Sequence, residues 1–299
     1  MSADTGAIAQ AADADPGGVS GTREVLRRFA RHRLAAVGTV VLLLLVVACF
    51  GAEWIAPYEK GAQDLALGPT PPSGAHLLGT DELGRDYLTE LLHAGRISLA
   101  IGFFVAVFAT VLGTAVGAVA GYRGGVVGEL IMRLTDLFLI VPAVAILALA
   151  LEALGSSPTT IVLVLAGISW TYIARVVRSQ VLSLREKEFI EAARVVGAST
   201  TRILVRHMLP NLAGLIAVNI SLATATAIIV ESTLSFLGFG VQPPRTSWGN
   251  MLSAAAGLVG TPQVYLLYFP GLFILVTVLC VNFIGDGLRD ALDPQGKQL

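Results

Sequence analysis

Residues 188–211 read EFIEAARVVGASTTRILVRHMLPN, a charged stretch in a chain that is otherwise strongly apolar. Apolar and small residues recur in it with helical spacing, which predicts an amphipathic helix with one narrow apolar face. Gly197 is suited to end this helix, because glycine tolerates a left-handed C-terminal cap. Ser199 or Thr200 can cap a second short helix, and Pro210 can occupy the first turn of the next one. The predicted apolar face consists of Phe189, Ala192, Ala193 and Val196.

The whole chain has the composition of an integral membrane protein. Of its 299 residues, 55% are hydrophobic and 14% are charged, and the mean hydropathy is +0.75. Soluble domains carry about 25% charged residues. The net charge of −1 gives no reason to expect nucleic acid as a partner. Cys49 and Cys280 both lie in apolar runs, so we interpret them as packing residues rather than as a disulfide or metal ligands.

Six apolar runs are long enough to cross a membrane as helices. The predicted fold class is therefore an all-α membrane protein with six transmembrane helices. The expected spans are 34–52, 97–122, 131–151, 160–177, 212–230 and 265–285. In the second span and just after it, small residues recur every fourth position, which predicts a close helix contact. These residues are Gly113, Gly117, Gly121 and Gly125.

The distribution of basic residues predicts the orientation of these spans. Basic residues flank the first span on its N-terminal side, and such flanks stay in the cytoplasm. With six spans, both termini then lie inside. This topology leaves few basic residues outside, as the positive-inside rule requires. They are Lys60, Arg85, Arg96 and Arg245.

We expect the chain to divide into four parts. The first is a disordered cytoplasmic N-terminus, because its residues are polar or small and show no periodicity. The second contains the first span and a polar extracytoplasmic segment, and the third is a five-helix transmembrane domain with a cytoplasmic loop at 183–210. The last is a cytoplasmic tail. The boundaries are 1–22, 23–95, 96–286 and 287–299.

The start of the chain permits one alternative. Residues 46–49, VVAC, are similar to a lipoprotein cleavage site, and basic residues before an apolar run are similar to a signal peptide. However, a long segment precedes the apolar run, and the run itself exceeds an ordinary signal sequence. We therefore interpret this region as an uncleaved first helix.

The opening stretch resembles a family signature. Residues 191–193 (EAA), Gly197 and residues 209–210 (LP) are similar to the EAA loop in the membrane subunits of ABC importers. His207 stands where that family usually has Ile, and residues 206–211 resemble the RHxLPN variant of the dipeptide, oligopeptide and nickel permeases. In that family the loop is the coupling helix that docks on the ATPase subunit. The alternative is an ordinary amphipathic helix lying on lipid headgroups. The resemblance implies ATPase-coupling roles for Phe189, Glu191, Ala192, Ala193, Val196, Gly197 and Arg202.

Residues 78–86, LGTDELGRD, resemble the LGTDxxGRD signature of the same permeases. The residues themselves predict a turn, followed by a helix with acidic residues in its first turns, where carboxylates meet exposed N–H groups. A structural lid and a contact for a binding protein explain this segment equally well. The candidate residues are Gly79, Asp81, Arg85 and Asp86.

Two further segments resemble the same family, namely residues 231–249, which match ExxLSFLGxGxxPPxxSWG, and residues 282–294, which match NxxGDxLRDxLDP. The glycines and prolines of 231–249 predict a rigid, non-helical excursion over the mouth of a pathway, because such backbone is tolerated at membrane depth only where protein or water satisfies it. The candidate outer-gate residues are Phe236, Gly238 and Trp248.

Polar residues within or at the ends of the spans have two readings each. Asn219, Ser221 and Thr224 in the fifth span could line a water-filled pathway or join helices. Arg133 and Asp136 could pair at the inner boundary or line the pathway.

The resemblance implies the type I (MetI-like) ABC importer fold, in the bacterial cytoplasmic membrane. The expected function is the import of dipeptides or oligopeptides, with nickel complexes or glutathione-like compounds as alternatives. The implied partners are a sister permease subunit, two ATPase subunits, an extracytoplasmic substrate-binding protein and membrane lipid.

We expect no catalytic or metal site on this chain. The chain contains no Walker A pattern, so ATP and Mg are expected on the ATPase subunits. A secondary transporter would need acidic residues within the spans, and the middles of the six predicted spans contain none. A membrane enzyme would need clustered His, Asp or Glu residues, whereas the four histidines lie at boundaries or in loops.

Overall fold

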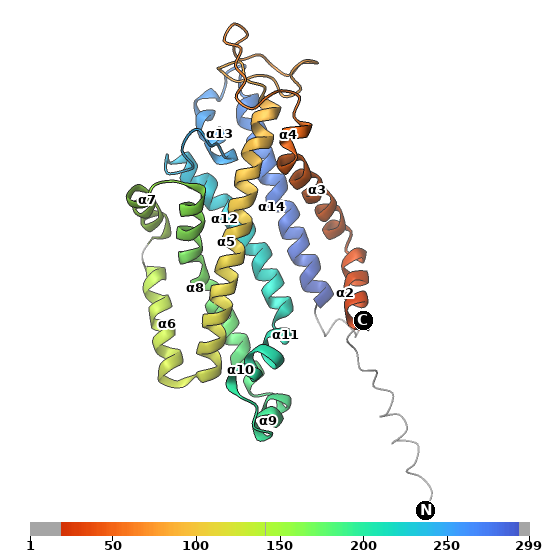
Figure 1. Cartoon of the computed structure of the whole chain (residues 1–299), viewed down its shortest axis with the longest axis vertical. Coiled ribbons are helices and arrows are strands. Elements are labelled where there is room, and N and C mark those ends of the chain that lie inside the picture. The colour runs from red at the N-terminus through yellow and green to blue at the C-terminus, as the bar shows by residue number, and fades with distance from the viewer. Residues whose placement is uncertain (1–18, 141, 293–299) are drawn as a thin grey trace, which may run out of the picture.

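The computed structural model describes residues 19–140 and 142–292, and the elements it assigns there are helices, with a single β-bridge between Thr80 and Asp86. The long helices lie side by side along one direction, with α9 at one end and the loops before α5 at the other (Figure 1). We call residues 56–86 the cap, and name the two ends of the molecule the cap end and the α9 end. The expected disorder of residues 1–22 falls almost wholly outside the described residues.

Five helices are long and apolar enough to cross a membrane, or six if a bent pair is counted as one span. Their surfaces expose many large apolar side chains, as contact with lipid requires. The all-α membrane fold is thereby confirmed. The five helices are α3 (Arg33–Phe50), α5 (Tyr87–Arg123), α8 (Pro158–Arg185), α12 (Ala213–Phe236) and α14 (Tyr265–Leu292).

The third predicted span, 131–151, is not one continuous helix. It consists of α6 (Gly125–Ile140) and α7 (Ala143–Leu154), whose directions differ by 85°. Pro142 occupies the N-cap position of α7. Proline has no backbone N–H to continue a preceding helix, and this accounts for the break.

Several helices extend beyond the apolar runs that predicted them. Helix α5 begins at Tyr87 rather than at 97, α8 continues to Arg185 rather than to 177, and α12 reaches Phe236 rather than 230. The first turns of α5 are buried under the cap instead of lying in lipid, so polar side chains there are satisfied by protein. Because α12 reaches Phe236, the first six residues of the 231–249 segment are helical, which corrects the start of the predicted non-helical excursion. Residues 237–247, which contain its prolines, are non-helical as predicted.

The glycines of α5 create a close contact with α8. A Cβ atom at Gly113, Gly117 or Gly121 would lie within 3 Å of a carbonyl oxygen of α8. The small-residue contact is therefore confirmed for three of the four predicted glycines. Gly125 lies beyond the end of α5, and a Cβ atom there would meet nothing within 4 Å.

Shorter elements complete the described chain. Cys49 and Cys280 are buried and unbonded, in agreement with a packing role. The shorter elements are α2 (Val19–Arg31), α4 (Ala52–Ile55), α9 (Glu188–Val195), α10 (Thr200–Arg202), the π-helix η1 (Ile203–Met208), α11 (Leu209–Asn211), α13 (Trp248–Ala254) and the 3-10 helix η2 (Ala256–Leu258).

Candidate functional site

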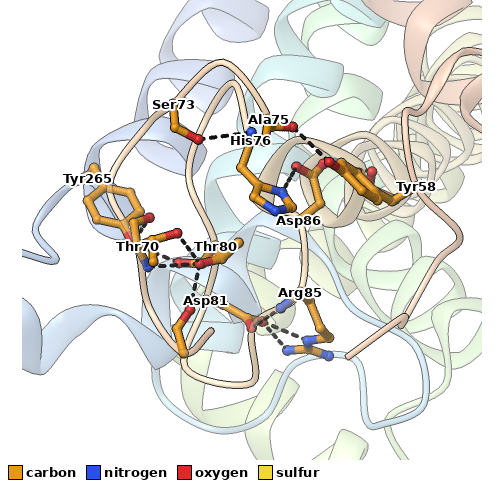
Figure 2. Close-up of polar contacts among 12 residues, drawn as sticks. Tyr58, Thr70, Ser73, Ala75, His76, Thr80, Asp81, Arg85, Asp86 and Tyr265 are labelled. Carbon is orange, nitrogen blue, oxygen red and sulfur yellow. Dashed lines mark hydrogen bonds and ion pairs between the residues drawn. The ribbon is translucent and has the colours of Figure 1, made fainter. Parts of the chain in front are cut away.

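The cap is organised around the buried side chain of Thr80 (Figure 2). Its hydroxyl accepts a hydrogen bond from the Thr70 N–H at 2.8 Å and donates to the Gly68 carbonyl at 2.6 Å. Gly79 has φ +80°, and a Cβ atom there would collide with the Thr70 carbonyl and the Tyr265 ring. The predicted turn at Gly79 therefore needs glycine both for its backbone conformation and for space.

Asp81 and Arg85 satisfy each other within one tight turn. The Asp81 carboxylate accepts from the backbone N–H groups of Leu83 and Arg85 at 2.9 and 3.0 Å. It also accepts from Nε and Nη2 of Arg85 at 2.7 and 2.6 Å (Figure 2). Charge-assisted hydrogen bonds of this kind hold a loop in a single conformation.

Asp86 is the N-cap of α5. Its buried carboxylate accepts from the backbone N–H of Thr89 at 2.9 Å and from the Thr89 hydroxyl at 2.8 Å. Its second oxygen lies 2.9 Å from Nδ1 of His76, whose ring stacks on Tyr58 with centroids 4.8 Å apart (Figure 2). The predicted helix with an acid at its start is thus confirmed, and the cap is folded onto it.

Two tyrosines fasten the cap and α5 to α14. The Tyr265 hydroxyl lies 2.8 Å from the Thr70 carbonyl and 2.7 Å from the Thr80 carbonyl. The Tyr87 hydroxyl donates to the Leu266 carbonyl at 2.5 Å. These contacts join segments that are almost 200 residues apart in the sequence, and they make the cap end one connected unit.

A cavity of about 390 Å³ opens between the cap and α13. Its polar lining is mainly acidic. Glu90 accepts from the Gly61 N–H at 2.7 Å, and Glu82 is exposed. A cavity of this volume is large enough for a small organic ligand, and its carboxylates would favour amino groups. The residues that give it this character are Asp81, Glu82, Arg85, Glu90 and Asn250.

A buried carboxylate lies where α12 meets α13. Glu231 is 1% exposed, and its Oε1 accepts from the hydroxyls of Ser235 at 2.7 Å and Ser247 at 2.6 Å. Ser247 also forms a capping box with Asn250 at the start of α13. Within the described ranges, the other Glu231 oxygen has no hydrogen-bond partner.

Trp248, the first residue of α13, is fully buried. Its backbone N–H donates to the Ser98 hydroxyl at 3.0 Å, and its indole N–H donates to the Leu91 carbonyl at 2.9 Å. A Cβ atom at Gly95 would collide with its ring. Trp248 therefore anchors α13 against α5 in this structure, while its role as an outer-gate contact stays a prediction.

The opposite end of the molecule presents α9. Ile190 is fully buried there, whereas Val195 and Val196 are 84% and 87% exposed. Gly197 ends the helix with φ +82°, as predicted. Ser199 then caps α10 by accepting from the Arg202 N–H at 3.3 Å. Ile190 is thus the buried side chain of α9, while most of its predicted apolar residues are exposed.

Two sequence comparisons classify the chain. The family described as "Binding-protein-dependent transport system inner membrane component" matches residues 113–297. The chain belongs to this family. Residues 20–72 match a second family, described as "N-terminal TM domain of oligopeptide transport permease C". The chain is therefore a transport permease, a non-catalytic multi-pass component of the bacterial inner membrane.

Curated relatives agree with this classification over nearly the whole chain. The oligopeptide transport system permease protein OppC of Escherichia coli (strain K12) is 43% identical over 92% of this chain and 91% of its own length. OppC of Mycobacterium tuberculosis (strain H37Rv) is 40% identical, over 92% of this chain and 95% of its own. The dipeptide transport system permease protein DppC of Bacillus subtilis (strain 168) is 37% identical, over 93% and 87%.

The permease structure brings the predicted site residues together in two places. The seven ATPase-coupling candidates all lie on α9, α10 or the turn between them, and Ala192 is exposed while Ala193 is half-buried. The cap holds Gly79, Asp81, Arg85 and Asp86. Phe236, half exposed, and Gly238, with φ +89°, lie at the end of α12. Their functional roles stay predictions.

The candidate pathway residues of the permease, all on α12, are buried or half-buried among its helices. Asn219 and Ser221 are buried, and Thr224 is half-buried. Each side chain donates to a carbonyl one turn earlier on α12, at 2.8, 3.3 and 2.8 Å respectively. A Cβ atom at Gly285 of α14 would meet the Ser221 side chain at 2.9 Å. For Ser221 this contact matches the helix-joining alternative, while a lining role stays a prediction.

Sequence reasoning missed several residues of the permease. Ile190, Thr80 and Tyr265 carry the attachments of α9 and the cap, but nothing in their local sequence marks them. Glu231 was placed just after the fifth span, whereas it lies inside α12. Asp136 forms the predicted ion pair with Arg133, at 4.0 Å, but sequence reasoning missed its hydrogen-bonded ion pair with Arg175 of α8.

Across the described ranges, no group of three or more His, Cys, Asp or Glu residues is arranged to hold a metal ion.

Proposed function

We propose that the chain is one permease subunit of an ATP-driven peptide importer and that α9 transmits force from an ATPase subunit. The observation that supports this role is the construction of the α9 end. The Ile190 side chain of the helix is fully buried, while Val195 and Val196 near its end are almost fully exposed. Exposed apolar side chains among charged ones are typical of a surface that another protein covers.

Helix α9 directly follows the span α8 and is connected to two further spans. The Arg194 guanidinium lies over the Tyr122 ring of α5, 5.3 Å from its centroid. In the other direction the chain continues through α10, η1 and α11 into α12. Movement of α9 would therefore reach both α5 and α12. Coupling between the ATPase subunit and the transport pathway requires two states of the permease in which α9 makes different contacts.

The proposed assembly contains this chain, a sister permease subunit, two ATPase subunits and an extracytoplasmic substrate-binding protein. ATP and Mg would be bound by the ATPases. The α9 end would face the cytoplasm and the cap end the outside, because the basic residues are concentrated toward the α9 end. The binding protein would then deliver its cargo at the cap, beside the acidic cavity near Glu82 and Glu90.

Peptides are the proposed substrate class, since the named relatives transport oligopeptides or dipeptides. Uptake of a labelled oligopeptide by cells that contain the whole transporter tests the substrate. The result expected is uptake that depends on this chain and on ATP. Unchanged peptide uptake after deletion of this chain would overturn the substrate assignment.

Gly197→Trp tests the coupling role of α9. A side chain at this position meets nothing within 4 Å of its Cβ, so the added ring would project outward into the docking surface. We expect normal insertion in the membrane, with at least a tenfold loss of ATPase co-purification and of peptide uptake. Gly197→Ala imposes the same backbone strain without the ring, and Gly155→Trp adds the ring at another glycine with φ +83°, before α8. Equal effects of all three variants would contradict the proposal.

A further inference from the structure

We propose that the chain holds one anionic phospholipid in a hollow at the cap end of α5. The hollow has a volume of about 780 Å³ and lies between the end of α3, the start of α5 and the start of α8. We call its charged side chains the basic rim and its aromatic side chains the aromatic wall. The basic rim is Lys60, Arg96 and Arg245, and the aromatic wall is Phe50, Phe104 and Phe108.

The basic rim contains three of the four Lys and Arg residues of the cap end. Of the four basic residues there, Arg85 is bound by Asp81, and the other three line this one hollow. One carboxylate, Glu53, also lines it and pairs with Arg96 at 3.0 Å. Both partners of that pair are substantially exposed, and exposed pairs are weak. Counting Glu53, the lining keeps an excess of two positive charges, which suits a phosphate group.

The aromatic wall begins where the basic rim ends. The Arg96 guanidinium lies 6.0 Å from the centroid of the Phe50 ring. Further along α5, Phe104 and Phe108 are eight and twelve residues beyond Arg96. At a rise of about 1.5 Å per residue, their Cα atoms lie roughly 12 and 18 Å along the helix axis from that of Arg96. Half of a bilayer's hydrocarbon core is about 15 Å thick. The hollow therefore extends over the depth of one lipid leaflet.

This combination favours a phospholipid over a free anion. A phosphate ion or a peptide carboxylate would engage the rim and leave the wall uncovered. The three wall rings are between 44% and 49% exposed, so they present apolar surface that an acyl chain would cover. A phospholipid supplies both parts in the observed order, with its phosphate at the rim and its chains along the wall. A zwitterionic lipid lacks the net charge that the rim selects.

Native mass spectrometry of the transporter, purified with its accompanying subunits from membranes rich in phosphatidylglycerol, tests the proposal. We expect one tightly retained phosphatidylglycerol that is lost in the triple variant K60Q/R96Q/R245Q. The expected weakening is on the order of a hundredfold. The triple variant R27Q/R31Q/R123Q removes as many exposed charges toward the α9 end and should retain the lipid. Glu53→Gln should strengthen retention, because it removes the competing carboxylate.

A second measurement locates the acyl chain and does not depend on the triple variant. Phe108→Trp places a fluorescent ring on the wall, and phosphatidylglycerol with brominated chains should quench it beyond the quenching seen in the parent chain. Equal retention of phosphatidylcholine, or full displacement by millimolar inorganic phosphate, would overturn the lipid assignment. So would crosslinking of a Phe108→Cys variant to the sister subunit, which would make the hollow a protein interface.

Discussion

The Ser247 hydroxyl donates a 2.6 Å hydrogen bond to the buried carboxylate of Glu231, and this contact joins the last turns of α12 to the start of α13. The same carboxylate oxygen accepts from Ser235 on α12 itself. One acidic side chain therefore fixes the position of α13, and with it the buried ring of Trp248.

Glu231→Ala is expected to lower the stability of the permease by about 1 to 3 kcal/mol, because two buried hydroxyls lose their shared acceptor. Glu231→Gln keeps an acceptor oxygen and should cost clearly less. Thermal unfolding of both variants in detergent measures the difference. Identical midpoints for the two variants would show that the hydrogen bonds contribute nothing.

Gly117→Ala is expected to destabilise the contact between α5 and α8 by about 1 to 3 kcal/mol, since the new methyl group would overlap the backbone of Ala174. Gly167→Ala on α8 is the matched control, because nothing lies within 4 Å of a Cβ atom there. The unfolding midpoint and the yield of folded chain report the effect. A Gly117→Ala variant as stable as Gly167→Ala would contradict the close contact.

Tyr265→Phe removes the hydroxyl that bonds the Thr70 and Thr80 carbonyls, and we expect the cap to open locally at a cost of about 1 to 2 kcal/mol. Hydrogen exchange of amides in residues 56–86 should accelerate. Tyr268→Phe serves as the control, since this side chain is exposed and makes no hydrogen bond in the described chain. Unaltered exchange in the cap would mean that other contacts hold it.

Ile190→Ala and Val196→Asp are expected to distinguish two roles of α9 residues. One role is to hold α9 against the rest of the permease, and the other is to bind the ATPase subunit. Ile190 is fully buried, so truncation should cost about 2 to 4 kcal/mol locally and expose α9 to proteolysis. Val196→Asp changes an exposed side chain, so the permease should resist proteolysis like the parent while losing ATPase co-purification. Proteolysis and co-purification in parallel check both. Normal co-purification with Val196→Asp would remove this face from the docking surface.

The features that could be predicted from sequence depend on local spacing. The contact of Gly113, Gly117 and Gly121 follows from their four-residue period, and the end of α9 follows from Gly197. The features that escaped prediction depend on distant partners. Tyr265 bonds carbonyls 185 and 195 residues away, and no local pattern marks such a contact.

The helix ends predicted from the apolar runs also differ from the observed ends. An apolar run marks the part of a helix that contacts lipid. The first turns of α5 are covered by the cap instead, so this helix includes polar residues before its apolar run begins. Glu231 was assigned to a loop for the same reason. Its charge ends the apolar run, whereas hydrogen bonds from Ser235 and Ser247 keep it inside α12.

The bonds of Tyr87 and Tyr265 also restrict how the permease can move. They tie α5, α14 and the cap together at one extremity, and the structure has no equivalent tie between α5 and α14 among the described hydrogen bonds near α9. Rotation of these two helices relative to each other must therefore pivot at the cap. A small angular change there produces its greatest displacement at the far end of the molecule, where α9 lies.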